Sequence, residues 1–226
     1  MRFAGSSLTM KLAQTLLAPL IALGMAAPAW AGADDNAIFV AADLDLSGSL
    51  SKTEFATTLE AGLSVRVINR RFAVADANRN GSIQLNEFLI FRGVIVASNK
   101  LERRFYVADA SINGTLDFDE FVLTYKARAS LVVIRRHFLR ADVDASGTLT
   151  LEEYLNHRRG LTPPGEFFTI FELTDFNNDG QITLAEFDNW FPQTANQARI
   201  AIRFEALDTN NDNILVTAEW NPGAQL

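Results

Sequence analysis

A repeat of fixed length is the feature that most constrains how this chain can fold. The repeated pattern has the form Asp-x-polar-x-polar-Gly-x5-Glu, so that a glutamate closes it eleven positions after the aspartate that opens it. Its six opening aspartates recur every 33 residues, at Asp43, Asp76, Asp109, Asp142, Asp175 and Asp208. Such a period predicts one supersecondary unit used repeatedly, in which each copy buries its apolar face against a neighbour.

The side-chain oxygens of each copy stand at alternate positions, which is the pattern that a Ca²⁺ loop requires. Ca²⁺ takes roughly six to eight oxygen ligands, and a 12-residue loop supplies them from positions 1, 3 and 5, the backbone carbonyl of position 7 and a bidentate glutamate at position 12. Position 6 needs a residue that tolerates positive φ, hence glycine. The pattern resembles the calcium loop of the EF-hand superfamily, and the resemblance covers about residues 35–220.

Positions 1, 3, 5, 7 and 12 of the loops give the predicted metal ligands. They are Asp43, Asp45, Ser47, Ser49, Glu54, Asp76, Asn78, Asn80, Ser82, Glu87, Asp109, Ser111, Asn113, Thr115, Glu120, Asp142, Asp144, Ser146, Thr148, Glu153, Asp175, Asn177, Asp179, Gln181, Glu186, Asp208, Asn210, Asp212, Ile214 and Glu219. The second loop carries only two carboxylates, and the sixth has Asn213 in place of glycine. We expect these two loops to bind Ca²⁺ most weakly.

Aromatic residues flank every loop and predict the core. Phenylalanine stands four positions before each loop, an aromatic residue follows each closing glutamate, and position 8 is always aliphatic. The resemblance implies an all-α fold of helix–loop–helix repeats, in three pairs, with short strand pairing between loops. The sequence Thr162-Pro163-Pro164-Gly165 should stop one helix before the next begins. We therefore place the first four units in residues 32–161 and the last two in residues 162–226.

The first 31 residues have the features of a secretory signal peptide. Arg2 and Lys11 precede an apolar stretch, and Ala29-Trp30-Ala31 matches a small-x-small cleavage site. The mature chain would then begin at Gly32, without a stable membrane span. Asn80 and Asn113 lie in glycosylation sequons at predicted ligand positions, where a glycan would abolish the site. This favours export to a bacterial periplasm, with secretion or the secretory pathway as the alternative.

Composition excludes several classes of function. The chain has no cysteine, two histidines and a net charge of −7, so thiolate metal sites are excluded and nucleic acid is not an expected partner. The repeats occupy nearly all of the mature chain, and we expect no enzymatic activity. Arginine pairs such as Arg70-Arg71 and Arg135-Arg136 are interpreted as solvated helix faces that balance the acidic loops, with contact to an anionic lipid or phosphate as the alternative.

Two functions remain for an exported protein that binds up to six Ca²⁺ ions, in whose loops we expect lanthanides to bind as well. The first is a calcium buffer, store or Ca²⁺-stabilised scaffold. The second is a sensor that exposes an apolar surface to a dedicated protein partner, not identified by the sequence. Adaptable sensor grooves are rich in methionine, whereas Met1, Met10 and Met25 all lie in the leader. This favours the first function.

Overall fold

The computed structural model describes residues 33–126, 128–163 and 168–222. The predicted signal peptide lies outside these residues, as do Pro164 and Gly165 of the predicted boundary. Within them the chain has 11 helices and six two-residue strands, which form five helix–loop–helix units and a sixth unit that has only its first helix and its loop. We call these units hands one to six. The predicted all-α fold with strand pairing between loops is confirmed.

Hands one and two, hands three and four, and hands five and six each share one two-stranded antiparallel sheet, so that the hands form three pairs. The first pair contains α1 (Ala33–Ala42), β1 (Ser49–Leu50), α2 (Lys52–Thr57), α3 (Val65–Ala75), β2 (Ile83–Gln84) and α4 (Leu85–Arg92). The second contains α5 (Lys100–Ala108), β3 (Thr115–Leu116), α6 (Phe118–Val122), α7 (Leu131–Ala141), β4 (Leu149–Thr150) and α8 (Leu151–Arg158). The third contains α9 (Ile170–Thr174), β5 (Ile182–Thr183), α10 (Leu184–Asp188), α11 (Gln197–Leu207) and β6 (Ile214–Leu215).

The core follows the flanking pattern of the sequence. The aliphatic residues at loop position 8 are completely buried where the paired strands meet, and these are Leu50, Ile83, Leu116, Leu149, Ile182 and Leu215. The flanking aromatics are at most 6% exposed, and these are Phe39, Phe55, Phe72, Phe88, Phe105, Phe121, Phe138, Tyr154, Phe171, Phe187, Phe204 and Trp220. They gather in three clusters, one for each pair, which confirms that they are packing residues.

The loops also define where the helices begin. In hands one, three, four and five, the residue at position 9 accepts a hydrogen bond from the N–H of the closing glutamate, whose carboxylate accepts one in return. This reciprocal arrangement is a capping box. The glutamate predicted to bind metal therefore also caps the first turn of the exiting helix. After β6, the described residues of hand six make only a turn.

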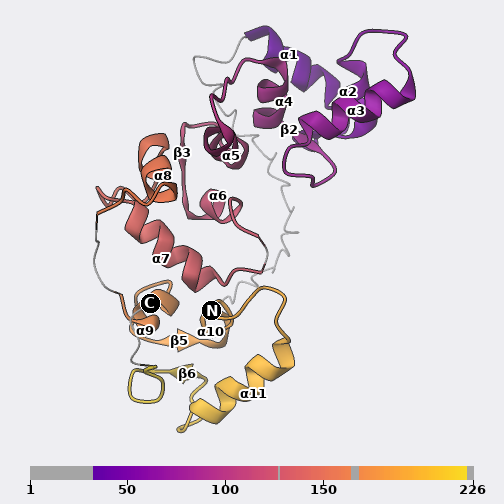
Figure 1. Ribbon diagram of the computed structural model, residues 1–226. Coiled ribbons are helices and arrows are strands. Elements are labelled where there is room, and N and C mark those ends of the chain that lie inside the picture. The colour runs from indigo at the N-terminus through magenta and orange to yellow at the C-terminus, as the bar shows by residue number, and fades with distance from the viewer. Residues whose placement is uncertain (1–32, 127, 164–167, 223–226) are drawn as a thin grey trace, which may run out of the picture.

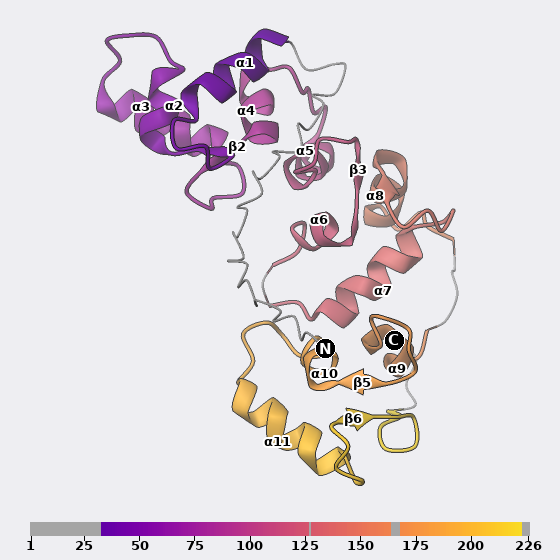
Figure 2. The ribbon, with the colours of Figure 1, turned by 180° about the vertical axis from the view of Figure 1, so that it is seen from behind.

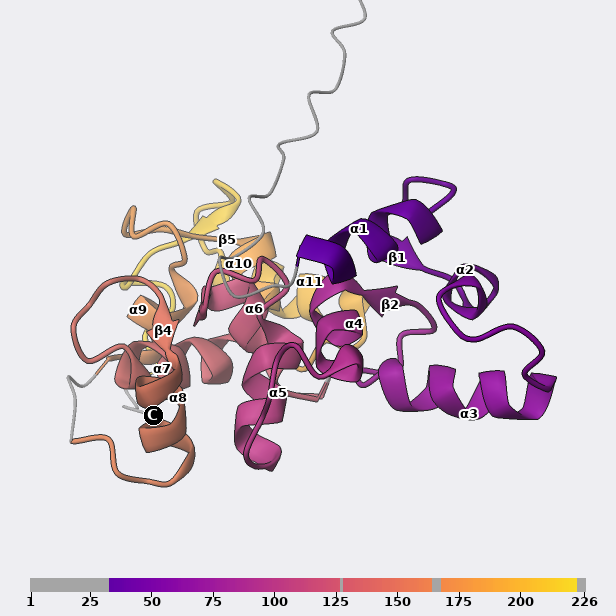
Figure 3. The ribbon, with the colours of Figure 1, turned by 90° about the horizontal axis from the view of Figure 1, so that it is seen from above.

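The three pairs follow one another in a row, as Figures 1 and 2 show from opposite sides. Seen from above, the first pair is displaced sideways from the other two (Figure 3). Helix α4 packs against α5, and α7 packs against α9. The third pair also meets the second where the Val132 N–H donates to the Asn189 carbonyl at 3.1 Å. The division at residue 162 stays a prediction.

Candidate metal centres

All six loops are built on the same hydrogen bonds to the first aspartate. In loop one, the N–H groups of Ser47 and Gly48 donate to the two oxygens of Asp43 at 3.0 and 2.9 Å. The N–H groups of positions 5 and 6 do the same in the other five loops. The backbone of each loop is thus wrapped around the carboxylate at position 1.

The closing glutamate joins the two ends of each loop. The Leu44 N–H donates to Glu54 Oε1 at 2.9 Å, and the Ser51 N–H donates to Glu54 Oε2 at 2.8 Å. Equivalent bonds, from position 2 or 3 and from position 9, reach the glutamate in every other loop. The backbone of each loop therefore orients both the aspartate at position 1 and the glutamate at position 12, which are predicted ligands.

Three carboxylates converge in the first and fourth loops. One ligand oxygen from each of Asp43, Asp45 and Glu54 lies within 4.8 Å of the others, and the same holds for Asp142, Asp144 and Glu153. At position 5, the Ser47 hydroxyl donates to the Ser49 carbonyl at 2.9 Å, and the Ser146 hydroxyl donates to the Thr148 carbonyl at 2.9 Å. The oxygens predicted at positions 5 and 7 therefore lie side by side.

The other loops replace carboxylates by amides. Asn80 Oδ1 accepts from the Ser82 N–H at 2.9 Å, and Asn113 Oδ1 accepts from the Thr115 N–H at 2.8 Å, which again brings positions 5 and 7 together. In the fifth loop, Asn177 Nδ2 donates to Asp179 Oδ2 at 2.9 Å. The sixth loop repeats this bond between positions 3 and 5, from Asn210 to Asp212 at 2.8 Å.

Carboxylates in these loops differ in their protonation equilibria. Burial raises the pKa of Glu87 and that of Asp109, because it penalises the charged form. The pKa values of Asp45 and Asp144 are lowered, chiefly by hydrogen bonds from the side chains of Ser47 and Ser146. The two groups with raised pKa values are the last predicted ligand of loop two and the first predicted ligand of loop three.

The backbone of loop six follows that of the other loops at position 6, and all six loops share a feature that the pattern does not contain. Asn213 adopts φ +66°, as glycine does at position 6 elsewhere, and its N–H donates to Asp208 at 2.9 Å. Position 4 is also left-handed in every loop, with φ between 56° and 62° at Leu46, Arg79, Ile112, Ala145, Asn178 and Asn211. The pattern treats position 4 as free, so sequence reasoning missed this requirement.

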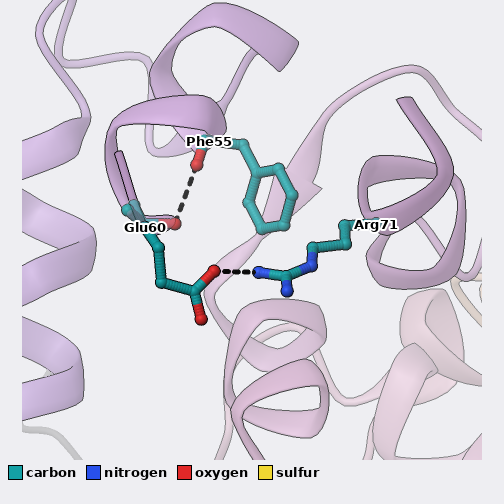
Figure 4. Close-up of polar contacts among 4 residues, drawn as sticks. Phe55, Glu60 and Arg71 are labelled. Carbon is teal, nitrogen blue, oxygen red and sulfur yellow. Dashed lines mark hydrogen bonds and ion pairs between the residues drawn. The ribbon is translucent and has the colours of Figure 1, made fainter. Parts of the chain in front are cut away.

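The arginine pairs divide into two kinds of contact. Arg71 forms an ion pair with Glu60 at 2.6 Å, beside Phe55 of the first core (Figure 4), and its side chain is 36% exposed. Arg135 instead bonds to backbone carbonyls near the fifth loop. The expectation of a solvated helix face is wrong for Arg135, because the packing of α7 against α9 places it at the boundary between two pairs.

The donors that meet in these loops are carboxylate, amide, hydroxyl and backbone carbonyl oxygens. Hard oxygen donors at this spacing suit Ca²⁺, whereas zinc and copper favour imidazole or thiolate ligands. The residues present therefore fit the ion that the resemblance implies.

Comparison with known proteins agrees with this geometry in two places. The family model described as an EF hand matches residues 68–91, and the one described as an EF-hand domain pair matches residues 155–189. No curated protein matches the chain.

Solved structures also resemble parts of the chain. A homolog of programmed cell death 6 protein from Leishmania major Friedlin is 25% identical, over 54% of this chain and 72% of its own, with a TM-score of 0.24. A redox protein from Chlamydomonas reinhardtii is 22% identical, over 65% of this chain and 52% of its own, with a TM-score of 0.25. This chain spans about half the length of that redox protein. What the chain contains, on its own sequence, is EF-hand domains in two places within a fold of helix–loop–helix repeats.

Proposed function

We propose that this protein is an exported Ca²⁺-binding protein that acts as a buffer, store or Ca²⁺-stabilised scaffold through six loops. The observation that carries the proposal is the common hydrogen-bond scaffold, which orients the carboxylates of positions 1 and 12 in every loop. The proposed ligands are the thirty residues named above, and no catalytic role is included in the proposal.

The loops should differ in affinity according to their charge. Loops one and four bring three carboxylates together and should take up Ca²⁺ first. Loop two offers only Asp76 and Glu87 as carboxylates, and loop six has Asn213 in place of the glycine at position 6, so these two loops should be the weakest. Extracellular modules of this type work at about 10⁻⁴–10⁻³ M Ca²⁺, which is the range that we propose for the complete chain.

The composition favours a buffer or scaffold over a sensor. A sensor exposes a methionine-rich apolar groove when it binds Ca²⁺, whereas the three methionines of this chain all lie in the predicted signal peptide. Export rests on the N-terminal sequence alone. In the part of the chain that the structure describes, no helix is long and apolar enough to cross a membrane.

The decisive experiment is a Ca²⁺ titration of the chain from Gly32, stripped with a chelator, with uptake and the fluorescence of a hydrophobic dye recorded together. Uptake with a flat dye signal supports the buffer or scaffold. A large rise in fluorescence during uptake would move the protein to the sensor class. No uptake at millimolar Ca²⁺ would exclude both. The double variant Glu54→Gln and Glu153→Gln should lose the two tightest sites.

Export has its own test. The full chain is expressed in a bacterium, and the protein from the periplasmic fraction is analysed by mass spectrometry. We expect a mature mass that begins at Gly32. An uncleaved chain confined to the cytoplasm would contradict the proposed location without affecting the proposed Ca²⁺ binding.

A further inference from the structure

One buried side chain of the first pair binds the end of the helix that leads into the third loop. Asn86 Nδ2 lies 3.1 Å from the Tyr106 carbonyl, 3.0 Å from the Val107 carbonyl and 3.0 Å from the Asp109 carbonyl. The Asn86 side chain belongs to α4, Tyr106 and Val107 belong to α5, and Asp109 is the first predicted ligand of loop three. Only 1% of Asn86 is exposed.

Arg135 makes the corresponding contact at the next boundary between pairs. Its Nη1 lies 3.2, 3.1 and 2.6 Å from the carbonyls of Glu172, Leu173 and Asp175. The guanidinium carbon also lies 4.7 Å from the ring centre of Phe176. Counted from the first aspartate of the loop, both donors bind the carbonyls of the third residue before it, the second residue before it and the aspartate itself. Two different residue types thus serve one acceptor site.

That acceptor site follows from helix geometry. The last carbonyls of a helix have no partner within it and carry the negative end of the helix dipole. In α5 and α9 these carbonyls come directly before the first ligand of a loop. A donor that binds several of these carbonyls fixes the end of the helix, and with it the position of the aspartate that follows.

Asn86 is also joined to the loop before it. It occupies position 11 of loop two, and its Oδ1 accepts a hydrogen bond from the Glu87 N–H at 2.9 Å. A small apolar cluster supports the same boundary, because Ile112 of loop three is 6% exposed and packs with Leu89 and Ile95. One amide side chain therefore contacts both the closing ligand of loop two and the opening ligand of loop three.

We propose that Asn86 and Arg135 are positioning residues that transmit Ca²⁺ binding from one pair of hands to the next. An ion that fixes Glu87 also fixes the neighbouring Asn86. Because Asn86 binds the Asp109 carbonyl, ordering Asp109 for the next ion then costs less free energy. The coupling is reciprocal, because linkage between two binding equilibria acts equally in both directions. Arg135 couples the fifth loop to α7, which is the helix that leads into the fourth loop. This inference rests on the proposed Ca²⁺ binding.

Each loop of the first five provides its own reporter for the test. The glycine at position 6 donates its N–H to the first aspartate, so a protein labelled with ¹⁵N-glycine reports the filling of single loops by NMR. The variant Glu87→Gln weakens loop two. We expect it to raise the Ca²⁺ midpoint at Gly114 by about threefold or more, which lies in the usual range of coupling between sites.

The variant Asn86→Ala removes the link. In that background, we expect Glu87→Gln to change the Gly114 midpoint by less than about twofold. An equal shift at Gly114 in both backgrounds would overturn the proposal, and so would an unmoved midpoint in the native background. If no glycine responds at millimolar Ca²⁺, it is the proposed function that fails.

Gly48 is the internal control for folding, because its loop pairs with loop two through β1 and β2. Its response to Glu87→Gln should persist without Asn86. If Gly48 loses its native signal in Asn86→Ala, the variant Asn86→Asp decides, since it keeps the Oδ1 acceptor for Glu87 and lacks the Nδ2 donor. Asn69→Ala, an exposed change on α3, is the matched surface control.

At the second boundary, Arg135→Met should raise the Ca²⁺ midpoint at Gly180 by about threefold or more and leave that at Gly147 within about twofold. Arg135→Lys should rescue Gly180 only in part, because an ammonium lacks the planar guanidinium that stacks on an aromatic ring and donates in a fixed fork. Equal shifts at Gly147 and Gly180 would indicate general destabilisation and contradict a positioning role.

Discussion

At the scale of single residues, position 4 of each loop is a site of backbone strain. Ala145 has φ +56° and is exposed, so its side chain gains no packing in return. L-residues disfavour this left-handed region, whereas glycine populates it freely. Relief of strain of about 1–2 kcal/mol outweighs the added freedom of the unfolded chain of about 0.4–1 kcal/mol, so we expect Ala145→Gly to stabilise the protein by about 0.5–1 kcal/mol in Ca²⁺-free buffer. The measurement is the free energy of unfolding in urea.

Ala110 provides the matched control for this substitution. It is an exposed alanine in the third loop, but its φ is not positive. Ala110→Gly should therefore destabilise by about 0.4–1 kcal/mol, because glycine only adds freedom to the unfolded chain. Changes of the same sign in both variants would contradict strain at position 4.

The low charge of loop two gives a second prediction for one residue. The Oδ1 of Asn80 accepts from the Ser82 N–H, and an aspartate can keep that bond. Asn80→Asp raises the number of ligand carboxylates in this loop, and affinity follows ligand charge. We expect the Ca²⁺ midpoint at Gly81 to fall about three- to tenfold, measured by ¹⁵N-glycine NMR. Asn69→Asp, which adds the same charge on α3, should leave it nearly unchanged.

How far the sequence predicts this site also depends on particular residues. The ligand spacing can be read directly, because calcium chemistry itself demands those residue types at those positions. The strain at Leu46 or Ile112 cannot, because any residue satisfies the pattern there. Asn86 and Arg135 bind carbonyls 20 to 40 positions away across a pair boundary. No local pattern specifies how one pair docks on the next.

At the scale of elements, the strands and helix starts were predictable and the contacts between helices were not. The aliphatic residue at position 8 predicts a strand that buries Leu116 against Leu149. No comparable sequence pattern predicts the cluster of rings at α7 and α8. There, the ring centres of His137 and His157 are 5.2 Å apart, and Tyr125 stacks on His137 at 5.9 Å.

This cluster makes the stability of the second pair depend on pH. Burial, followed by His137 and the nearby Arg158 and Arg140, lowers the pKa of His157 from 6.5 to about 4. Between these two values the unfolded state binds the proton more readily, so the free energy of unfolding falls as the pH decreases from about 6.5 to about 4. Because the ring is partly exposed, we expect a loss of about 1–2 kcal/mol.

The measurement compares wild type with His157→Gln by urea unfolding at pH 7 and pH 5 in Ca²⁺-free buffer. Carboxylates titrate in both proteins, so their effect cancels in the difference. The advantage of the wild type should shrink as the pH falls. A constant difference between the two proteins would show that His157 does not titrate differently on folding.

At the scale of the whole molecule, the three cores set how stability is distributed. Each pair buries its own aromatic cluster, and small contacts such as the one around Ile112 join neighbouring pairs. Stability in chains of repeats is a sum of unit and interface terms. Damage to one core should therefore remain largely local.

The variant Ile182→Ala tests this distribution. Ile182 is completely buried in the third core, and its truncation should cost about 2–5 kcal/mol there. Hydrogen exchange should accelerate in α10 and α11 and stay within the native range in α3 and α4. Ile202→Ala, on an exposed position of α11, should change neither region. Equal acceleration in the first and third pairs would instead mean that the row of hands unfolds as one cooperative unit, in which the contacts at the pair boundaries are as strong as the cores.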